Sequence, residues 1–175
     1  MSVRVLSDLL LLVFVTAAAV SDLMRRKIPN RLVLAGLLAA LALHGTLGAP
    51  STLLDCAGGM ATGFFLFLPL YLLRGMAAGD VKLIAMVGAF AGPWPALLIC
   101  FSTFVLGGLM ALLIVTWQGS WHACWRNLRQ LLWPLMVRTA GLAPSSPANH
   151  ASVGNMPYGL AIALGALLVQ GRNYF

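Results

Sequence analysis

The sequence of 175 residues contains no glutamate and only four aspartates. Charged residues make up 9% of the chain, whereas a soluble domain carries about 25%. Hydrophobic residues account for 61% of it, and its mean hydropathy is +0.93. This composition excludes a soluble globular enzyme, a disordered chain and a nucleic-acid-binding protein with a basic face. Any acid chemistry must come from the four aspartates, which are Asp8, Asp22, Asp55 and Asp80.

Cysteine and histidine are also scarce, with three residues of each. The cysteines form no CxxC pair and stand far apart in the sequence, so we expect neither a disulfide framework nor a zinc site. The histidines form no pair at metal-ligand spacing. We therefore expect no metal and no cofactor, and we assign these six residues to packing or interfacial positions.

Long apolar runs fill most of the chain, and a transmembrane helix needs about 20 such residues. Five runs approach or reach this length, and a sixth run of 11 residues lies between the third and the fourth of them. The sixth run would cover only about 16 Å of a hydrocarbon core about 30 Å thick. In chain order the six candidate spans are Val5–Val20, Leu32–Leu47, Leu53–Leu73, Val81–Ala91, Ala96–Trp117 and Val153–Val169.

The distribution of basic residues indicates whether the short run crosses the membrane. If it crosses, nine of the 11 lysines and arginines face the cytoplasm and two face outside; otherwise the division is seven against four. Because cytoplasmic loops are enriched in lysine and arginine, the sequence predicts six spans with both termini outside. We therefore predict an all-α, polytopic membrane bundle that forms a single domain over residues 1–175. Its fourth span is short and sunk between its neighbours, and a tight outer turn follows at residues 92–95.

An additional helix is expected at residues 118–138, between spans five and six. Three tryptophans and two leucines between residues 117 and 132 recur at spacings of four, four, three and four residues, which places them on one helical face. Basic residues occupy the neighbouring face. This pattern is typical of a helix that lies in the cytoplasmic interface and is anchored against anionic lipid. Contact with a substrate is the alternative role.

Glycines recur at the spacing that favours close helix packing. Gly59 and Gly63 form one GxxxG pattern, and Gly88 and Gly92 form another. Such patterns let the backbones of two membrane helices approach each other closely. We interpret both as packing motifs.

Two of the four aspartates are candidates for chemistry. In the six-span topology Asp22 and Asp80 lie at the same depth on the cytoplasmic side, whereas the other two lie toward the outside. Two carboxylates in a low-dielectric cleft share a proton. One of them can then accept a proton from water while the other protonates a carbonyl oxygen, as in aspartic proteases. The structural alternatives are an ion pair of Asp22 with Arg25 or Arg26 and a helix cap at Asp80.

Three segments resemble motifs of the type IV prepilin peptidases, which are membrane aspartic peptidases with a GxGD motif. The match is closest to the small members found in Flp-type (tight-adherence) pilus systems, and it extends from about Val5 to Val169. One departure concerns Ala77, which stands where the first glycine of the GxGD motif is expected. The three segments run from Asp22 to Leu32, from Gly79 to Leu83, and from Met156 to Gly159.

The resemblance implies an endopeptidase of the inner membrane that removes the basic leader of prepilins at the cytoplasmic face. Asp22 and Asp80 match the catalytic pair, and Gly79 matches the second glycine of the motif. The resemblance also implies that four further residues line the active site or contact the substrate, namely Lys82, Pro157, Tyr158 and Gly159. Lys82 and the basic cluster at residues 25–27 are expected either to orient the leader or to contact anionic lipid.

Only residues 23–31 separate the first two spans, where larger members of the family insert a domain with paired CxxC motifs. We therefore expect peptidase activity without methylation of the new N-terminus and without zinc. The expected partners are a prepilin and the lipid bilayer, and no nucleic acid. Two other functions stay open, namely a proton or ion translocator, because acids at membrane depth often mark proton paths, and a non-catalytic subunit of pilus assembly, which Ala77 leaves possible.

Overall fold

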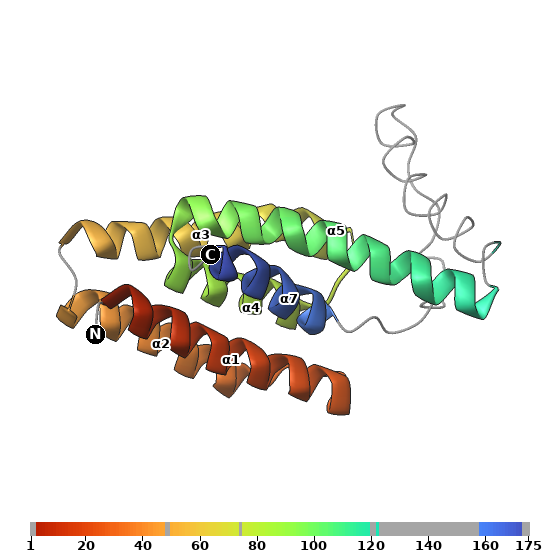
Figure 1. The fold of residues 1–175 in the computed structure, drawn as a ribbon, viewed down its shortest axis with the longest axis horizontal. Helices are drawn as coiled ribbons and strands as arrows, with labels where there is room; N and C mark the ends of the chain where they lie inside the picture. Colours follow the sequence, from red (N-terminus) through yellow and green to blue (C-terminus); the bar gives the residue numbers. More distant parts are fainter. Residues whose placement is uncertain (1–2, 48–49, 74, 120–121, 123–157, 173–175) are drawn as a thin grey trace. The chain divides into compact units, whose positions relative to one another are not determined.

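The computed structural model describes residues 3–47, 50–73, 75–119, 122 and 158–172, and all regular structure within these ranges is helical (Figure 1). Most of the predicted interfacial helix at 118–138 lies outside the described residues, as does Pro157. Contacts divide the chain into two units, residues 1–108 with 157–175 and residues 109–156. The helices are α1 (Val3–Arg25), α2 (Asn30–Leu47), α3 (Pro50–Leu72), α4 (Ala78–Ala91), α5 (Pro93–Gln118) and α7 (Tyr158–Gly171).

The six helices correspond to the six predicted apolar runs, which confirms the all-α bundle. In the described part of the chain, three helical segments are long and apolar enough to cross a membrane, namely Val5–Arg25, Thr52–Leu72 and Pro93–Trp117. Two shorter apolar helices, Asn30–Thr46 and Tyr158–Gly171, accompany them. Many large apolar side chains of these helices are exposed. Exposed apolar area of this extent indicates contact with lipid.

Helix α4 forms the centre of the first unit. Ten of its 14 residues are buried, and it contacts α1, α2, α3 and α7. A helix that is apolar on all sides lies either in a protein core or in a membrane, and the burial of α4 by its neighbours shows the first case. The prediction of a short helix sunk between its neighbours is therefore correct. Lys82 is an exception near its start, since this side chain is exposed.

The close packing of α4 against α3 depends on glycine. A Cβ atom on Gly59 would collide with the carbonyl oxygen of Gly88, and a Cβ atom on Gly88 would collide with that of Gly59. Gly63 makes a similar approach to the carbonyl oxygen of Ile84. The two backbones thus touch where side chains would normally separate them. The GxxxG patterns contribute to close helix approach, as the sequence predicts.

The connection between α4 and α5 is shorter than predicted. Gly92 alone separates the two helices, and Pro93 already begins α5. Gly92 has φ of 85°, a conformation that favours glycine, and its N–H donates a hydrogen bond to the carbonyl oxygen of Gly88. Proline is favoured at the first position of a helix because its missing N–H would have no intrahelical partner there. The predicted turn at residues 92–95 is therefore wrong in extent.

Candidate active site

Asp22 lies near the end of α1 and is buried, with 7% of its surface exposed. Its Oδ2 atom accepts a hydrogen bond of 2.8 Å from the backbone N–H of Gly159. Gly159 belongs to the first turn of α7, where backbone N–H groups have no intrahelical acceptor. Helices α1 and α7 run side by side (Figure 1). Within the described residues Asp22 forms no ion pair with Arg25 or Arg26, so that structural alternative is wrong.

The end of α1 is fixed one turn after Asp22. Arg26 adopts φ of 51°, and its N–H donates to the carbonyl oxygen of Asp22 at 2.8 Å. The left-handed conformation costs a residue other than glycine about 1–2 kcal/mol. Ser21 Oγ donates to the carbonyl oxygen of Lys27 at 2.9 Å, which ties the linker back onto α1. Because α2 begins at Asn30, residues 26–29 form the whole connection.

Asp80 lies in the first turn of α4 and is 6% exposed. The N-cap of this helix is Ala77, so the alternative in which Asp80 is itself the cap is wrong. Asp80 is the third residue of the helix, and its Oδ2 accepts a hydrogen bond of 3.2 Å from the N–H of Ala77. An acidic side chain at this position commonly reaches back to the N-cap in this way. The contact leaves the second carboxylate oxygen available for chemistry.

Ala77 replaces a motif glycine without a conformational penalty. Its backbone has φ of −81° and ψ of 153°. These angles lie in the extended region that every L residue adopts. The substitution would disrupt the loop only if the position required positive φ, and it does not. The departure from the GxGD pattern therefore gives no structural reason to doubt the site.

The two carboxylates lie together although α1 and α4 carry them separately. Asp22 and Asp80 are close enough to interact electrostatically. Asp80 interacts in the same way with Tyr158, which is half-buried at the start of α7. The first two residues of α7 thus reach both acids, since Gly159 bonds to Asp22.

The remaining two aspartates lie at the opposite end of α4. Ser7, the neighbour of Asp8, donates its hydroxyl to the carbonyl oxygen of Phe90. A Cβ atom on Gly92 would lie 4.0 Å from the Cβ of Asp55. Twelve helical residues correspond to about 18 Å, so neither acid reaches Asp80. Asp22 and Asp80 are thus the two aspartates near the start of α4.

The linker after α1 packs on the start of α4. A Cβ atom on Gly79 would lie 3.5 Å from the Cβ of Ile28, which is ordinary van der Waals contact. Lys82 Nζ donates a hydrogen bond of 3.2 Å to Oδ1 of Asn30. Neither Ile28 nor Asn30 is a predicted site residue, although both flank Pro29, which separates α1 from α2. These contacts connect the segment after Asp22 to the segment around Asp80.

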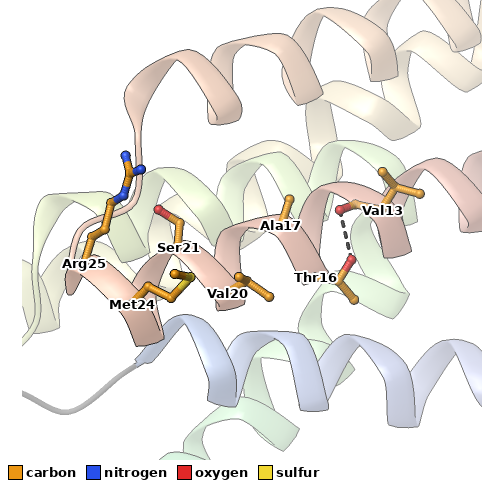
Figure 2. Close-up of a pocket in the computed structure, with 7 residues that line it drawn as sticks. All are labelled: Val13, Thr16, Ala17, Val20, Ser21, Met24 and Arg25. Carbon is orange, nitrogen blue, oxygen red and sulfur yellow. Dashed lines mark hydrogen bonds between the residues drawn. The ribbon is translucent and has the colours of Figure 1, made fainter.

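A groove of about 560 Å³ lies elsewhere on α1. Figure 2 shows its lining, and the hydroxyl of Thr16 bonds to the carbonyl oxygen of Val13, so that it needs no solvent partner. Neither aspartate lines this groove, and the helical spacing puts Asp22 on another face of α1. We therefore regard the groove as part of the lipid-facing surface. Its lining residues are Val13, Thr16, Ala17, Val20, Ser21, Met24 and Arg25.

One comparison with known proteins identifies a family. A sequence model described as the type IV leader peptidase family matches residues 9–112, which is more than half of the chain. The matched region contains Asp22, Asp80 and the packed helices α3 and α4, and it ends before α7. No curated protein and no solved structure matches the chain. Among the described residues, no group of three or more His, Cys, Asp or Glu could hold a metal ion. On the extent of the family match, together with the apolar helices, this integral membrane protein belongs to the type IV leader peptidase family.

Proposed function

We propose that this peptidase removes the leader of Flp-type prepilins at the cytoplasmic face of the inner membrane, with Asp22 and Asp80 as its catalytic pair. Its family consists of aspartic-type prepilin peptidases, so the hydrolysis of a prepilin follows from membership. The pilus type, the side of the membrane and the catalytic residues are our additions. The observation that carries the catalytic assignment is the pairing of two buried carboxylates on different helices.

The proposed chemistry is general acid–base catalysis by the carboxylate pair. The ionised member accepts a proton from water, whose oxygen then forms a bond to the carbonyl carbon of the scissile peptide. The protonated member donates its proton to the carbonyl oxygen in the same step. When the tetrahedral intermediate collapses, the C–N bond breaks and the leaving amine takes a proton from the carboxyl group that had accepted one, while a hydroxyl group of the intermediate returns a proton to the other carboxylate. No residue beyond the two acids has to change its charge.

The surroundings of Asp80 suit the approach of an extended substrate. Ala77 and Ala78 are exposed, and Gly79 is partly exposed. None of them carries a side chain larger than methyl, so a peptide backbone can come close to the carboxylate. Hydrolysis requires this approach because the water and the carbonyl carbon must meet between the two acids.

Charge supports the cytoplasmic side. Arg25, Arg26, Lys27 and Arg31 are exposed around the linker that follows Asp22. Cytoplasmic segments next to membrane helices are enriched in such residues, and anionic headgroups of that leaflet attract them. We therefore propose that this end of the bundle faces the cytoplasm and that both termini face the periplasm.

The length of the linker supports the pilus type. Residues 26–29 are the only ones between α1 and α2, which leaves no inserted domain at that point. The larger members that the sequence resembles carry their methylating domain there. We therefore propose that the product keeps an unmethylated N-terminus.

The test is cleavage by the purified full chain in liposomes. A Flp-type prepilin with its basic leader is added, and the product is analysed by mass spectrometry. We expect one cut that releases the leader, an unmethylated new N-terminus, and a rate that an imposed membrane potential does not change. If the wild-type chain leaves the prepilin intact, the function is wrong. Proton or ion flux that depends on the potential would favour a translocator, and a methylated product would refute the proposed subtype.

Gly79→Ala provides a separate test of how the substrate approaches. The added methyl group meets Ile28 at an ordinary distance, so thermal stability should not fall. The same methyl group narrows the path to Asp80, and we expect KM to rise about tenfold, as one misplaced methyl group typically costs. Gly171→Ala is the control because nothing lies within 4 Å of its Cβ position. An unchanged KM would show that the substrate does not pass over Gly79.

A further inference from the structure

The contact between α7 and Asp22 joins residues that are 137 positions apart in the sequence. Both partners are buried, and the hydrogen bond of 2.8 Å is short for a backbone N–H donor. The N–H of Gly159 is held in place because this residue lies in the first turn of α7. The N-terminal end of a helix also carries a partial positive charge that stabilises a nearby carboxylate. Asp22 therefore has a rigid and favourable partner.

This contact requires that residue 159 have no side chain. A Cβ atom there would lie 2.9 Å from Oδ2, 3.0 Å from Cβ and 3.2 Å from Cγ of Asp22. These distances are below normal contact, and Asp22 is buried. An alanine would have to displace either the carboxylate or the first turn of α7. In both cases the orientation of Asp22 changes.

We propose that Gly159 is a positioning residue, whose N–H and missing side chain hold the Asp22 carboxylate in its reactive orientation. The inference rests on the proposed catalytic role of Asp22. A catalytic group must be held within about 0.5 Å of its productive position, and the side chain of Asp22 has no other hydrogen-bond partner among the described residues. Tyr158, the residue before Gly159, interacts electrostatically with Asp80. The start of α7 thus fixes one acid relative to the other.

The chain offers matched controls on the same helix. A Cβ atom on Gly165 would lie 2.7 Å from Oγ1 of Thr103, so Gly165→Ala crowds α7 two turns away from Asp22. Gly171→Ala adds a methyl group where no atom lies within 4 Å. Gly165→Ala tests the effect of a steric collision on α7 away from Asp22. Gly171→Ala tests the effect of replacing glycine by alanine without a collision. Neither residue touches an aspartate.

The first readout is the kinetics of prepilin cleavage in liposomes. We expect Gly159→Ala to lower kcat about 100-fold, because a displacement of about 1 Å has this effect in an active site. KM should stay within about twofold, as should both parameters of Gly171→Ala. Gly165→Ala should retain most of its kcat. If Gly159→Ala and Gly165→Ala lower kcat equally, crowding of α7 explains the loss and the inference is wrong.

The second readout is infrared spectroscopy, which needs no substrate. With four aspartates and no glutamate, the carboxyl bands of protein labelled with ¹³C-aspartate are few enough to assign. The band that disappears in Asp22→Asn belongs to Asp22. It should shift in Gly159→Ala and stay in place in Gly165→Ala. An unshifted band would overturn the inference whether or not the chain cleaves prepilins, whereas an inactive wild-type chain would overturn only the proposed function.

A backbone ester at residue 159 covers the case in which Gly159→Ala does not fold. Glycolic acid in place of Gly159 removes the N–H and adds no side chain, so the fold has no steric reason to change. We expect kcat to fall at least about tenfold, since the lost hydrogen bond is to a charged group. Full activity of the ester would contradict a role for this N–H.

Discussion

Asp22→Asn and Asp80→Asn are each expected to lower the rate of leader removal at least about 1,000-fold, as removal of an acid–base residue does in other proteases. An amide has nearly the shape of a carboxyl group, yet it neither accepts the proton of the attacking water nor donates one to the carbonyl oxygen. Both members of the pair are required at once. The loss should therefore be similar for the two variants and should not deepen much in the double variant.

The fold should survive these substitutions. The amide oxygen at position 22 can still accept the N–H of Gly159, and that at position 80 can still accept the N–H of Ala77. The thermal unfolding temperature is the measurement that checks this. Loss of activity with unchanged unfolding would mean that the acids act in the chemistry rather than in the packing.

Asp8→Asn and Asp55→Asn are the matched controls for charge and composition. Both residues lie at the far end of α4 from Asp80, as Ser7 and Gly92 indicate. Each variant should keep its single-turnover rate within about twofold of wild type. Processing by Asp22→Asn or Asp80→Asn at more than a tenth of the wild-type rate would be incompatible with a two-aspartate mechanism.

Gly88→Ala is expected to lower the free energy of unfolding by about 3 kcal/mol, at the upper end of the usual cost of overpacking. Its Cβ atom would meet the carbonyl oxygen of Gly59, which is backbone and cannot rotate away. The helices must therefore separate along their contact. Because α4 also carries Asp80, the displacement should lower cleavage as well. Thermal unfolding in detergent and the cleavage rate measure the two effects.

Two further variants make this prediction specific. Gly59→Ala creates the reciprocal collision, in which its Cβ atom meets the carbonyl oxygen of Gly88. The loss of stability in the double variant should be smaller than the sum of the two single losses, because one separation of α3 from α4 relieves both collisions. Gly45→Ala has its nearest neighbour at 3.9 Å and should gain up to about 1 kcal/mol from helix propensity. Equal stability of Gly88→Ala and Gly45→Ala would show that the α3–α4 contact is not close.

The sequence located the helices because lipid demands long apolar runs, and such runs are visible without any structure. The predicted first span ends at Val20, whereas helix α1 continues through polar residues to Arg25. Backbone hydrogen bonds, unlike hydropathy, do not stop at Ser21. As a result Asp22 lies within the last turn of the helix, which fixes the direction of its side chain.

Contacts between distant segments were beyond sequence reasoning. The resemblance indicated Gly159 as an active-site residue, but its hydrogen bond to Asp22 depends on how α7 packs against α1. The backbone conformation of Ala77 could not be predicted from the sequence either, because alanine adopts both helical and extended angles. Pro157 and most of residues 118–138 lie outside the described residues, so their predicted roles stay predictions.

The extended backbone of Ala77 bears on how relatives of this chain are recognised. A search pattern that requires glycine two positions before Gly79 requires a residue that can adopt positive φ, and the backbone at this position does not have positive φ. Residue 77 shares with residues 78 and 79 a side chain no larger than methyl and at least partial exposure, in the segment that leads to Asp80. A pattern that accepts alanine there would admit chains with the same backbone path. A strict GxGD pattern does not match this chain, because residue 77 is alanine.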